Sequence, residues 1–198
     1  MRLSFRFRWI PFVAALVVAI VGISLGNWQM RRADEKLALQ QAMRSRAEFV
    51  PLNANALAQG ARPDEFRSIT ANGEFLGEWA VYLDNRPMQG RAGFYLLMPM
   101  KLAGSEQVAL VMRGWFPRDA VDRMRIPRIP LPDAPVNIEG RIRASAGRLM
   151  QLGQAEALHP GAVVQNAEIA EFRHASKLPL QDFIIEQTSD TQDGLVRD

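Results

Sequence analysis

Residues 9–25 of the chain read WIPFVAALVVAIVGISL, and no charged residue occurs between Arg8 and Arg31. A helix rises about 1.5 Å per residue, so this uncharged stretch is long enough to cross the roughly 30 Å hydrocarbon core of a bilayer. Pro11 falls in the first turn of the expected helix, where a missing N–H is tolerated. Residues 9–30 are therefore predicted to form a transmembrane helix that anchors the rest of the chain.

The alternative is a cleaved signal peptide, which also combines a basic start with an apolar stretch of about 7–15 residues. The stretch here is longer, and its small pair Gly22 and Ser24 does not resemble an Ala-x-Ala cleavage site. We therefore favour the anchor. The basic residues 1–8 are assigned to the cytoplasm, although further Lys and Arg in residues 31–48 leave the charge bias between the two sides small.

The composition narrows the range of functions. The chain has no cysteine, which excludes disulfides, thiolate metal sites and cysteine nucleophiles. Its net charge is only +3 and no basic stripe alternates with aromatic residues, so nucleic acid is not an expected partner, whereas membrane lipid is. The apolar stretch begins at Trp9, which leaves no space before it for an amphipathic transit peptide. We expect a bacterial inner membrane, with the bulk of the chain on the periplasmic side.

A helical extension is predicted over residues 31–48, which are rich in helix formers and contain neither Pro nor Gly. Trp28, Arg32 and Lys36 then fall at i, i+4 and i+8 on one face, where Arg32 can lie over the Trp28 ring. This face is a candidate binding surface. The alternative is an interfacial aromatic belt whose basic residues reach lipid headgroups.

Beyond the helix, residues 49–187 show the pattern of a β domain. Residues 136–143 alternate between apolar and polar side chains, as a strand with one buried face does. Residues 91–99 and 107–113 are apolar on both faces, which suits a barrel or a sheet covered on each side. Further strands are expected at 67–74, 79–83 and 182–187, and a short helix at 167–177. Residues 188–198 are expected to form a flexible tail.

The predicted fold is thus anchored in the membrane and mainly β, and it belongs to the α+β class. An N-terminal transmembrane helix is followed by an antiparallel, barrel-like β domain with one or two short helices. Residues 126–132 are too rich in proline for strand pairing and are expected to form an extended surface arm. The roughly 165 residues after the anchor are enough for one such domain with a proper core.

No catalytic constellation is present. The chain has two histidines, His159 in a turn and His174 in the expected helix, and both have the character of surface residues. Nucleophile elbows, phosphate loops and zinc-protease motifs are missing, and no pair of carboxylates is singled out by its spacing. We expect neither enzymatic activity nor a bound metal.

Methionine provides the one alternative metal site. Met98 and Met100, with Met112 on the neighbouring strand, offer thioethers that suit copper(I). Methionines on apolar strands more often fill a core, however, and we favour that interpretation.

A group of arginines provides the main candidate site in the β domain. Arg86, Arg91 and Arg113 occur at strand ends or in a loop, among several aromatic residues that include Trp115. Such a cluster can grip the carboxylates of an amphipathic ligand or acidic groups on a partner. The alternative is a set of solvated charges around the mouth of a barrel.

Several short motifs occur in a characteristic order. They are Gly26-x-Trp28-Gln29-x-x-Arg32-x-x-x-Lys36 directly after the apolar helix, Gly73-Glu-Phe75, Leu83-Asp-Asn-Arg86, Gly90-Arg-x-Gly-Phe94 and Arg113-Gly-Trp-x-Pro117. Together they resemble the Surfeit locus protein 1 family. The resemblance runs from the membrane helix through the last strand, and it depends on the order and spacing of the motifs more than on any one of them.

The resemblance implies an assembly factor for haem-copper cytochrome c oxidase, which acts on subunit I with other assembly factors and assists haem a insertion. The implied cofactor, if one is carried, is haem a, held transiently. Residues assigned to cofactor or partner binding are Trp28, Arg32, Arg86, Arg91, Arg113, Trp115 and His174. The alternative function is a cofactor-free docking module that stabilises an assembly intermediate.

Members of the family usually carry a second membrane helix near the C-terminus, with a histidine at its start proposed as a haem ligand. The sequence ends at Asp198, where that segment is expected to follow. Neither His159 nor His174 matches the position of that histidine.

Overall fold

The structure, a computed structural model, describes residues 9–47, 49–122, 125–133, 135–150 and 156–197. The chain divides into two compact units, residues 1–45 and 46–198. The first contains most of the long helix α1 (Trp9–Ala47), whose last two residues are counted with the second. Within α1, the segment Trp9–Ala38 has a mean hydropathy of 2.3 in its apolar window and is long enough to cross a membrane.

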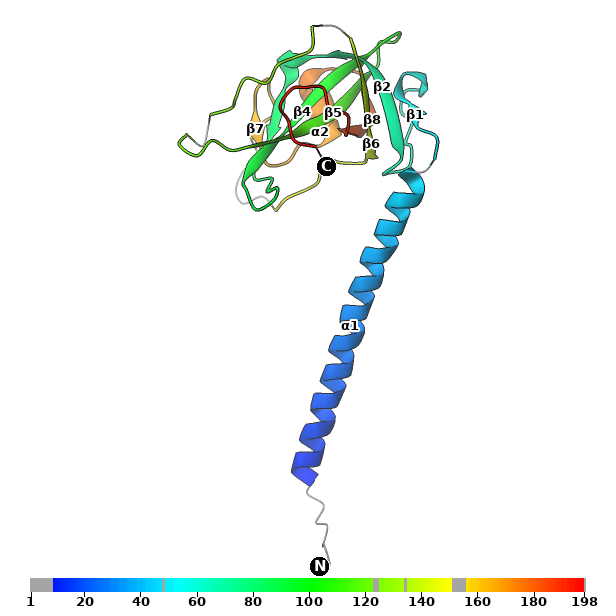
Figure 1. Cartoon of the computed structure of the whole chain (residues 1–198), viewed down its shortest axis with the longest axis vertical. Coiled ribbons are helices and arrows are strands. Elements are labelled where there is room, and N and C mark those ends of the chain that lie inside the picture. Colours follow the sequence, from blue (N-terminus) through cyan, green and yellow to red (C-terminus); the bar gives the residue numbers. More distant parts are fainter. Residues whose placement is uncertain (1–8, 48, 123–124, 134, 151–155, 198) are drawn as a thin grey trace, which may run out of the picture. The chain divides into compact units, whose positions relative to one another are not determined.

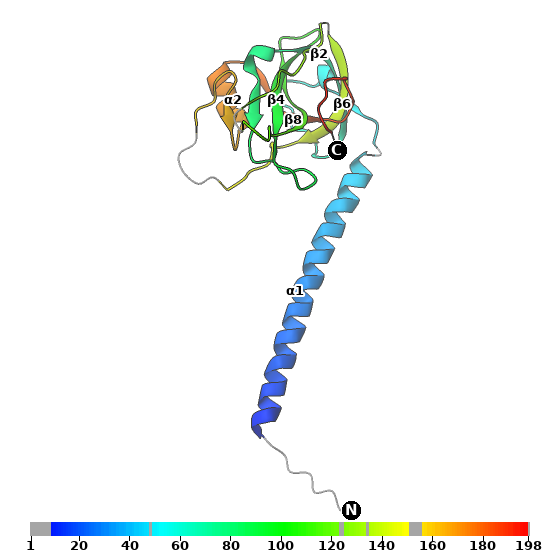
Figure 2. The same cartoon turned by 60° about the vertical axis from the view of Figure 1, so that its left-hand side comes forward.

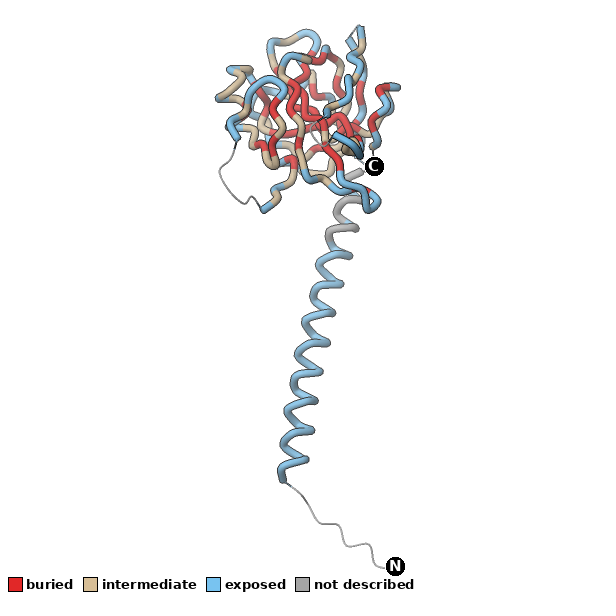
Figure 3. The backbone as a smooth tube through the Cα atoms, turned by 90° about the vertical axis from the view of Figure 1, so that its left-hand side faces the viewer, coloured by how far each residue is buried: buried red, intermediate tan, exposed pale blue. Residues whose placement is uncertain are grey.

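Helix α1 confirms that the apolar stretch and the polar segment after it form one continuous helix. Its described side chains from residue 9 to residue 38 are exposed, while the buried residues gather in the second unit (Figure 3). An apolar helix with exposed side chains suits a lipid environment, because lipid supplies the apolar contacts that water does not.

The second unit is mostly β structure with one α-helix. A closed barrel is formed by the strand order β2-β6-β8-β5-β4, with β4 pairing back onto β2 (Figure 1). Short strands β3 and β7 extend the sheet beyond β4, and β1 pairs with β2. The elements in chain order are β1 (Leu52–Asn53), a 3-10 turn (Ala54–Ala56), β2 (Ser68–Phe75), a second 3-10 turn (Gly77–Trp79), β3 (Val81–Leu83), β4 (Gly93–Leu102), β5 (Val108–Pro117), β6 (Val136–Arg143), β7 (Val163–Val164), α2 (Ile169–Ser176) and β8 (Leu180–Gln187).

The predicted barrel-like β domain is confirmed, and most of its neighbouring strands are antiparallel. The pair β5–β8 is parallel, as are the short pairs β1–β2 and β3–β7. Between β6 and β8 the chain passes through β7 and α2 before it returns to the barrel. The parallel neighbours β5 and β8 are thus joined by a long connection through β6, β7 and α2, as parallel strands require, because a tight hairpin can join only antiparallel strands.

Gly73 marks the point where the barrel closes. It pairs with Val136 of β6 on one side and with Leu102 of β4 on the other. A side chain here has no space, because a Cβ atom at Gly73 would lie 2.1 Å from the carbonyl oxygen of Lys101. The glycine inside β2 therefore allows the close approach of β4, and the pairing of β2 with β6 runs through it without a bulge.

The two-sided apolar pattern of β4 and β5 has a direct structural cause. Their residues alternate between two apolar clusters, with Leu96 and Val111 facing the barrel interior and Leu97 and Leu110 facing a second, outer core. Helix α2 lies at one side of the β domain (Figure 2). It contributes Phe172 to this outer core, where the Phe172 ring lies 5.8 Å from that of Trp79. The sequence prediction of strands covered on both faces is confirmed.

Two segments near the barrel end differ from expectation. Strand β5 continues to Pro117 instead of ending near Arg113. The segment after Gln187, expected to be a flexible tail, packs on the barrel as a C-terminal segment (residues 189–197). Its Val196 exchanges backbone hydrogen bonds of 2.7 and 2.8 Å with Trp115, and Leu195 is buried against the interior cluster. The polar composition of the segment did not predict this packing, because only Leu195 and the carboxylate of Asp193 are buried in it among the described residues.

Candidate functional site

Arg113 of β5 lies inside the barrel instead of at its rim. Its side chain has an exposed fraction of 0% and donates to the carboxylate of Asp193 over 2.7 Å. Its guanidinium carbon also lies 4.4 Å from the centre of the Phe75 ring. Burial lowers the pKa of Arg113, and the neighbouring Asp193 carboxylate opposes that change. The solvated rim charge considered from the sequence is thus a buried, paired arginine.

Asp193 is shared by two arginines. Arg197 donates to the same carboxylate oxygen over 2.6 Å, and its side chain is also nearly buried. Burial favours the neutral form of Asp193, but the hydrogen bonds from Arg197, the Leu195 amide and Thr191 outweigh it and hold the pKa of Asp193 below its usual value. The three charges form a closed internal network, so Arg113 is not available to an external ligand in this arrangement.

Arg86 and Trp115 also serve internal contacts. The Arg86 guanidinium donates to the carbonyl oxygens of Gly147 and Gln165 over 2.8 and 3.0 Å. The indole N–H of Trp115 donates to the carbonyl oxygen of Arg86 over 2.7 Å. These bonds tie the loop after β3 to β5 and to the segments on both sides of β7, which is the role of a structural arginine.

Three other predicted binding residues, Arg91, Trp28 and Arg32, belong to two different units of the chain. Arg91 lies in the loop before β4 with an exposed side chain. Trp28 and Arg32 belong to α1, where the Arg32 guanidinium lies 5.5 Å from the Trp28 ring centre, as the i, i+4 spacing predicts. Trp28 remains 44% exposed. In the structure, the arginine cluster expected in the β domain is therefore divided between buried contacts and one exposed loop residue.

The methionines considered for copper lie on opposite faces of the sheet. Met98 and Met100 point into the barrel interior, whereas Met112 belongs to the outer core. In addition, the Met98 sulfur accepts a hydrogen bond from the guanidinium of Arg113 over 3.8 Å. Among the described residues, no group of three His, Cys, Asp or Glu side chains is arranged to hold a metal ion.

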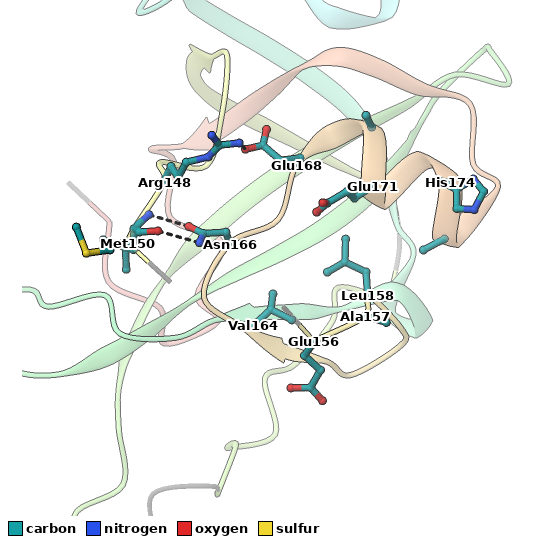
Figure 4. Close-up of a pocket in the computed structure, with 13 residues that line it drawn as sticks. Arg148, Met150, Glu156, Ala157, Leu158, Val164, Asn166, Glu168, Glu171 and His174 are labelled. Atoms are coloured by element: carbon teal, nitrogen blue, oxygen red, sulfur yellow. Dashed lines mark hydrogen bonds and ion pairs between the residues drawn. The ribbon is translucent and has the colours of Figure 1, made fainter. Parts of the chain in front are cut away.

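His174, the last predicted site residue, lines a cavity of the β domain. This pocket has a volume of about 950 Å³ and lies between α2, β7 and the segments 148–150 and 156–158 (Figure 4). A cavity of this size falls within the usual range for ligand sites. Its described lining consists of Arg148, Leu149, Met150, Glu156, Ala157, Leu158, Val164, Asn166, Glu168, Ala170, Glu171, His174 and Ala175.

Local hydrogen bonds fix one wall of the pocket. The Asn166 side chain forms two bonds with the backbone of Leu149, from the Leu149 amide over 2.7 Å and to its carbonyl over 3.0 Å. On the same side, Arg148 pairs with Glu168 just before α2 over 2.8 Å. Figure 4 shows these paired groups at one end of the pocket and His174 at the other. The wall is therefore set by contacts between the segment before β7 and the start of α2.

Helix α2 forms the opposite wall because of its periodicity. Ala170, Glu171, His174 and Ala175 recur at the spacing that places residues on one helix face, while Phe172 faces the outer core. Of the sequence predictions, only His174 belongs to this wall. The rest of the pocket comes from short segments within residues 148–168 that carry no helical periodicity, so helical spacing around His174 was the single local signal for it.

The pocket does not fit haem a. A haem carries two anionic propionates, whereas the pocket rim carries the carboxylates of Glu156, Glu168 and Glu171. Arg148 is already paired with Glu168, which leaves His174 as the remaining lining side chain, among those described, that can bear a positive charge. Like charges at this rim oppose the binding of an anionic ligand.

A comparison with models of protein families identifies the family of this chain. The model of the SURF1 family matches residues 16–197, which includes nearly all of α1 and the complete β domain. The chain belongs to the SURF1 family. This confirms the resemblance derived from the ordered motifs.

Individual members of the SURF1 family are similar over parts of the chain. A SURF1-like protein of Dictyostelium discoideum is 26% identical over 125 residues, or 59% of this chain and 46% of its own length. A SURF1-like protein of Rickettsia felis is 32% identical over 106 residues, covering 52% of this chain and 45% of that protein. The cytochrome oxidase assembly protein SHY1 of Saccharomyces cerevisiae is 27% identical over 120 residues, covering 57% and 30%. The matches thus span less than half of each relative.

Proposed function

We propose that this SURF1-family chain is an assembly factor for haem-copper cytochrome c oxidase. The observation that carries the proposal is the family match over residues 16–197, together with similarity to a yeast protein named for cytochrome oxidase assembly. The role is one of binding and not of catalysis. In this proposal α1 anchors the protein in a bacterial inner membrane, and the β domain works on the periplasmic side beside subunit I of the oxidase.

We further propose that the protein assists haem a insertion by holding subunit I, with other assembly factors, in a receptive state. Internal contacts of the β domain favour this form of assistance over a haem site built from its arginines. Arg113 is buried against Asp193, and Arg86 is committed to two backbone carbonyls. A docking role needs only exposed surface, which α1, the Arg91 loop and the pocket rim provide.

The proposal is tested by removing the protein from a cell that makes haem a. We expect lower oxidase activity and less haem a in subunit I, both restored when the 198-residue chain is supplied. Full activity with normal haem a content in the deletion strain, at low oxidase expression, would contradict the proposal.

A second experiment separates docking from cofactor carriage. Subunit I is captured on the tagged protein in cells that can and cannot make haem a. Equal capture in both cells supports the docking form of the proposal. Capture that disappears without haem a would show that the cofactor itself mediates the contact.

A further inference from the structure

We propose that the pocket beside α2 binds a basic, amphipathic segment of a partner protein. This inference rests on the pocket alone and holds whichever process the protein serves. Its starting point is the contrast between the pocket's apolar floor and its acidic rim, on a chain whose overall charge is +3.

The floor of the pocket is apolar and adaptable. Leu158 and Val164 line the pocket below α2 in Figure 4. Ala170 and Ala175 of α2 also line the pocket, and their small side chains leave space along the helix. Met150 at the edge is 87% exposed, although it is a large apolar side chain. Unbranched methionines adapt to the shape of an incoming apolar surface. The floor is therefore suited to two or three apolar side chains of a helix laid along the pocket.

The charge of the rim determines which polar side chains the bound helix should carry. Glu168 is neutralised by Arg148. Glu171 forms no ion pair with any described residue, and Figure 4 shows its carboxylate over the pocket. Within the described part of the chain, Glu156 pairs with His159 alone, over 3.8 Å, and His159 is charged only when protonated. Two carboxylates without a permanent countercharge thus remain on the rim, and they complement Lys or Arg that flank apolar residues.

The test uses the full chain in nanodiscs of phosphatidylcholine, a lipid without net charge, so that the membrane does not compete for a basic probe. The probe is a fluorescent peptide of about 14 residues, roughly four helical turns, with Leu on one face and Lys on the other. A matched peptide carries Glu in place of each Lys. We expect the Lys peptide to bind in fluorescence anisotropy and the Glu peptide to bind at least tenfold more weakly, with the difference falling as salt is raised.

Variants locate the binding. Glu171→Gln and Glu156→Gln are each expected to weaken binding of the Lys peptide by up to about fivefold, and together by about tenfold. Glu74→Gln, an exposed carboxylate on β2 away from this pocket, is the matched control and should leave binding unchanged. Binding that is unaffected in the double variant would overturn the proposal.

Photocrosslinking gives a second readout that does not depend on rim charge. A photoreactive amino acid at Met150 should crosslink to the Lys peptide, whereas the same group at Val121, which is 96% exposed in a loop, should not. Equal crosslinking at the two positions, or equal affinity for the Lys and Glu peptides, would show a merely apolar attraction and would overturn the assignment of a basic partner.

Discussion

The carboxylate of Asp193 lies between the guanidinium groups of Arg113 and Arg197, and all three side chains are nearly shielded from water. Replacing Asp193 by Asn leaves two buried cations without their shared anion. Breaking a buried pair in this way destabilises a protein by about 3–5 kcal/mol. We expect Asp193→Asn to lower the free energy of unfolding by that amount, as measured by urea unfolding followed through tryptophan fluorescence.

Asp190→Asn is the matched control. Asp190 contacts the same Arg197 over 3.4 Å, but its own side chain is largely exposed. Exposed ion pairs contribute about 0–1 kcal/mol, so this variant should unfold almost as the parent protein does. If the two substitutions had equal effects, the buried network would not be what secures the C-terminal segment.

The same carboxylate predicts a dependence of stability on pH. The pKa of Asp193 is lowered in the folded protein, so folding favours its ionised form. Its contribution is fully present above the unfolded pKa of about 3.9 and is lost as pH falls through the lower, folded value. We expect the free energy of unfolding to decrease between about pH 5 and pH 2, and to decrease less in Asp193→Asn.

The variant comparison is needed because Asp182 acts in the same direction. A hydrogen bond from Arg173 is the main cause that lowers the pKa of Asp182. Only the part of the acid-induced loss that disappears in Asp193→Asn belongs to the buried network. An identical pH profile in the parent and the variant would contradict the assignment.

At the residue level the sequence predicted some contacts well. Arg32 and Trp28 are four residues apart in a helix, so their contact follows from spacing alone. Arg113 and Asp193 are 80 residues apart, and no local pattern links them. For that reason the sequence suggested a solvated arginine where the structure has a buried one, and a loose tail where it has a packed segment.

Among the elements, α2 holds the outer core and the pocket together. Phe172 is fully buried in that core, against Trp79. We expect Phe172→Ala to destabilise the β domain by about 3–5 kcal/mol through lost burial and a residual cavity. His174→Ala, on the exposed face of the same helix, should change stability by less than about 0.5 kcal/mol. Guanidinium unfolding of both variants tests this, and a His174→Ala effect as large as that of Phe172→Ala would contradict it.

The strand predicted best from the sequence is one whose two faces have different surroundings. Residues 136–143 form β6 as expected, because one face meets the barrel interior and the other meets solvent. The short strands β1 and β7 each pair over two residues, which is too short for a periodic signal, whereas β3 lies within the strand predicted at 79–83. The pocket was missed for a related reason: its walls come from separate segments, and only α2 carries a local pattern.

For the whole molecule, the division into two units predicts that membrane insertion and β-domain stability respond to different substitutions. Val18 is 71% exposed on the apolar part of α1. Arginine near the centre of a membrane helix costs about 2.5–3.5 kcal/mol in insertion. We expect Val18→Arg to reduce the fraction of protein that resists carbonate extraction, without changing the melting temperature of the β domain.

Val121→Arg is the control for that experiment, because Val121 is equally apolar and lies in an exposed loop of the β domain. It should alter neither measurement. A lower melting temperature in Val18→Arg would mean that the helix and the β domain do not behave as separate units.

The position of β8 has a consequence for the order of events during synthesis. Strand β8 pairs with both β5 and β6, and Asp193 follows it. The barrel therefore cannot close until residue 187 has been made. Chains are synthesised from the N-terminus, and early strands must wait for late ones. Chains arrested at Lys177 should therefore be digested rapidly by protease, unlike the finished chain. While it waits, the growing protein exposes apolar side chains of β4 and β5, and we expect chaperones that shield such surfaces to raise the yield of folded protein.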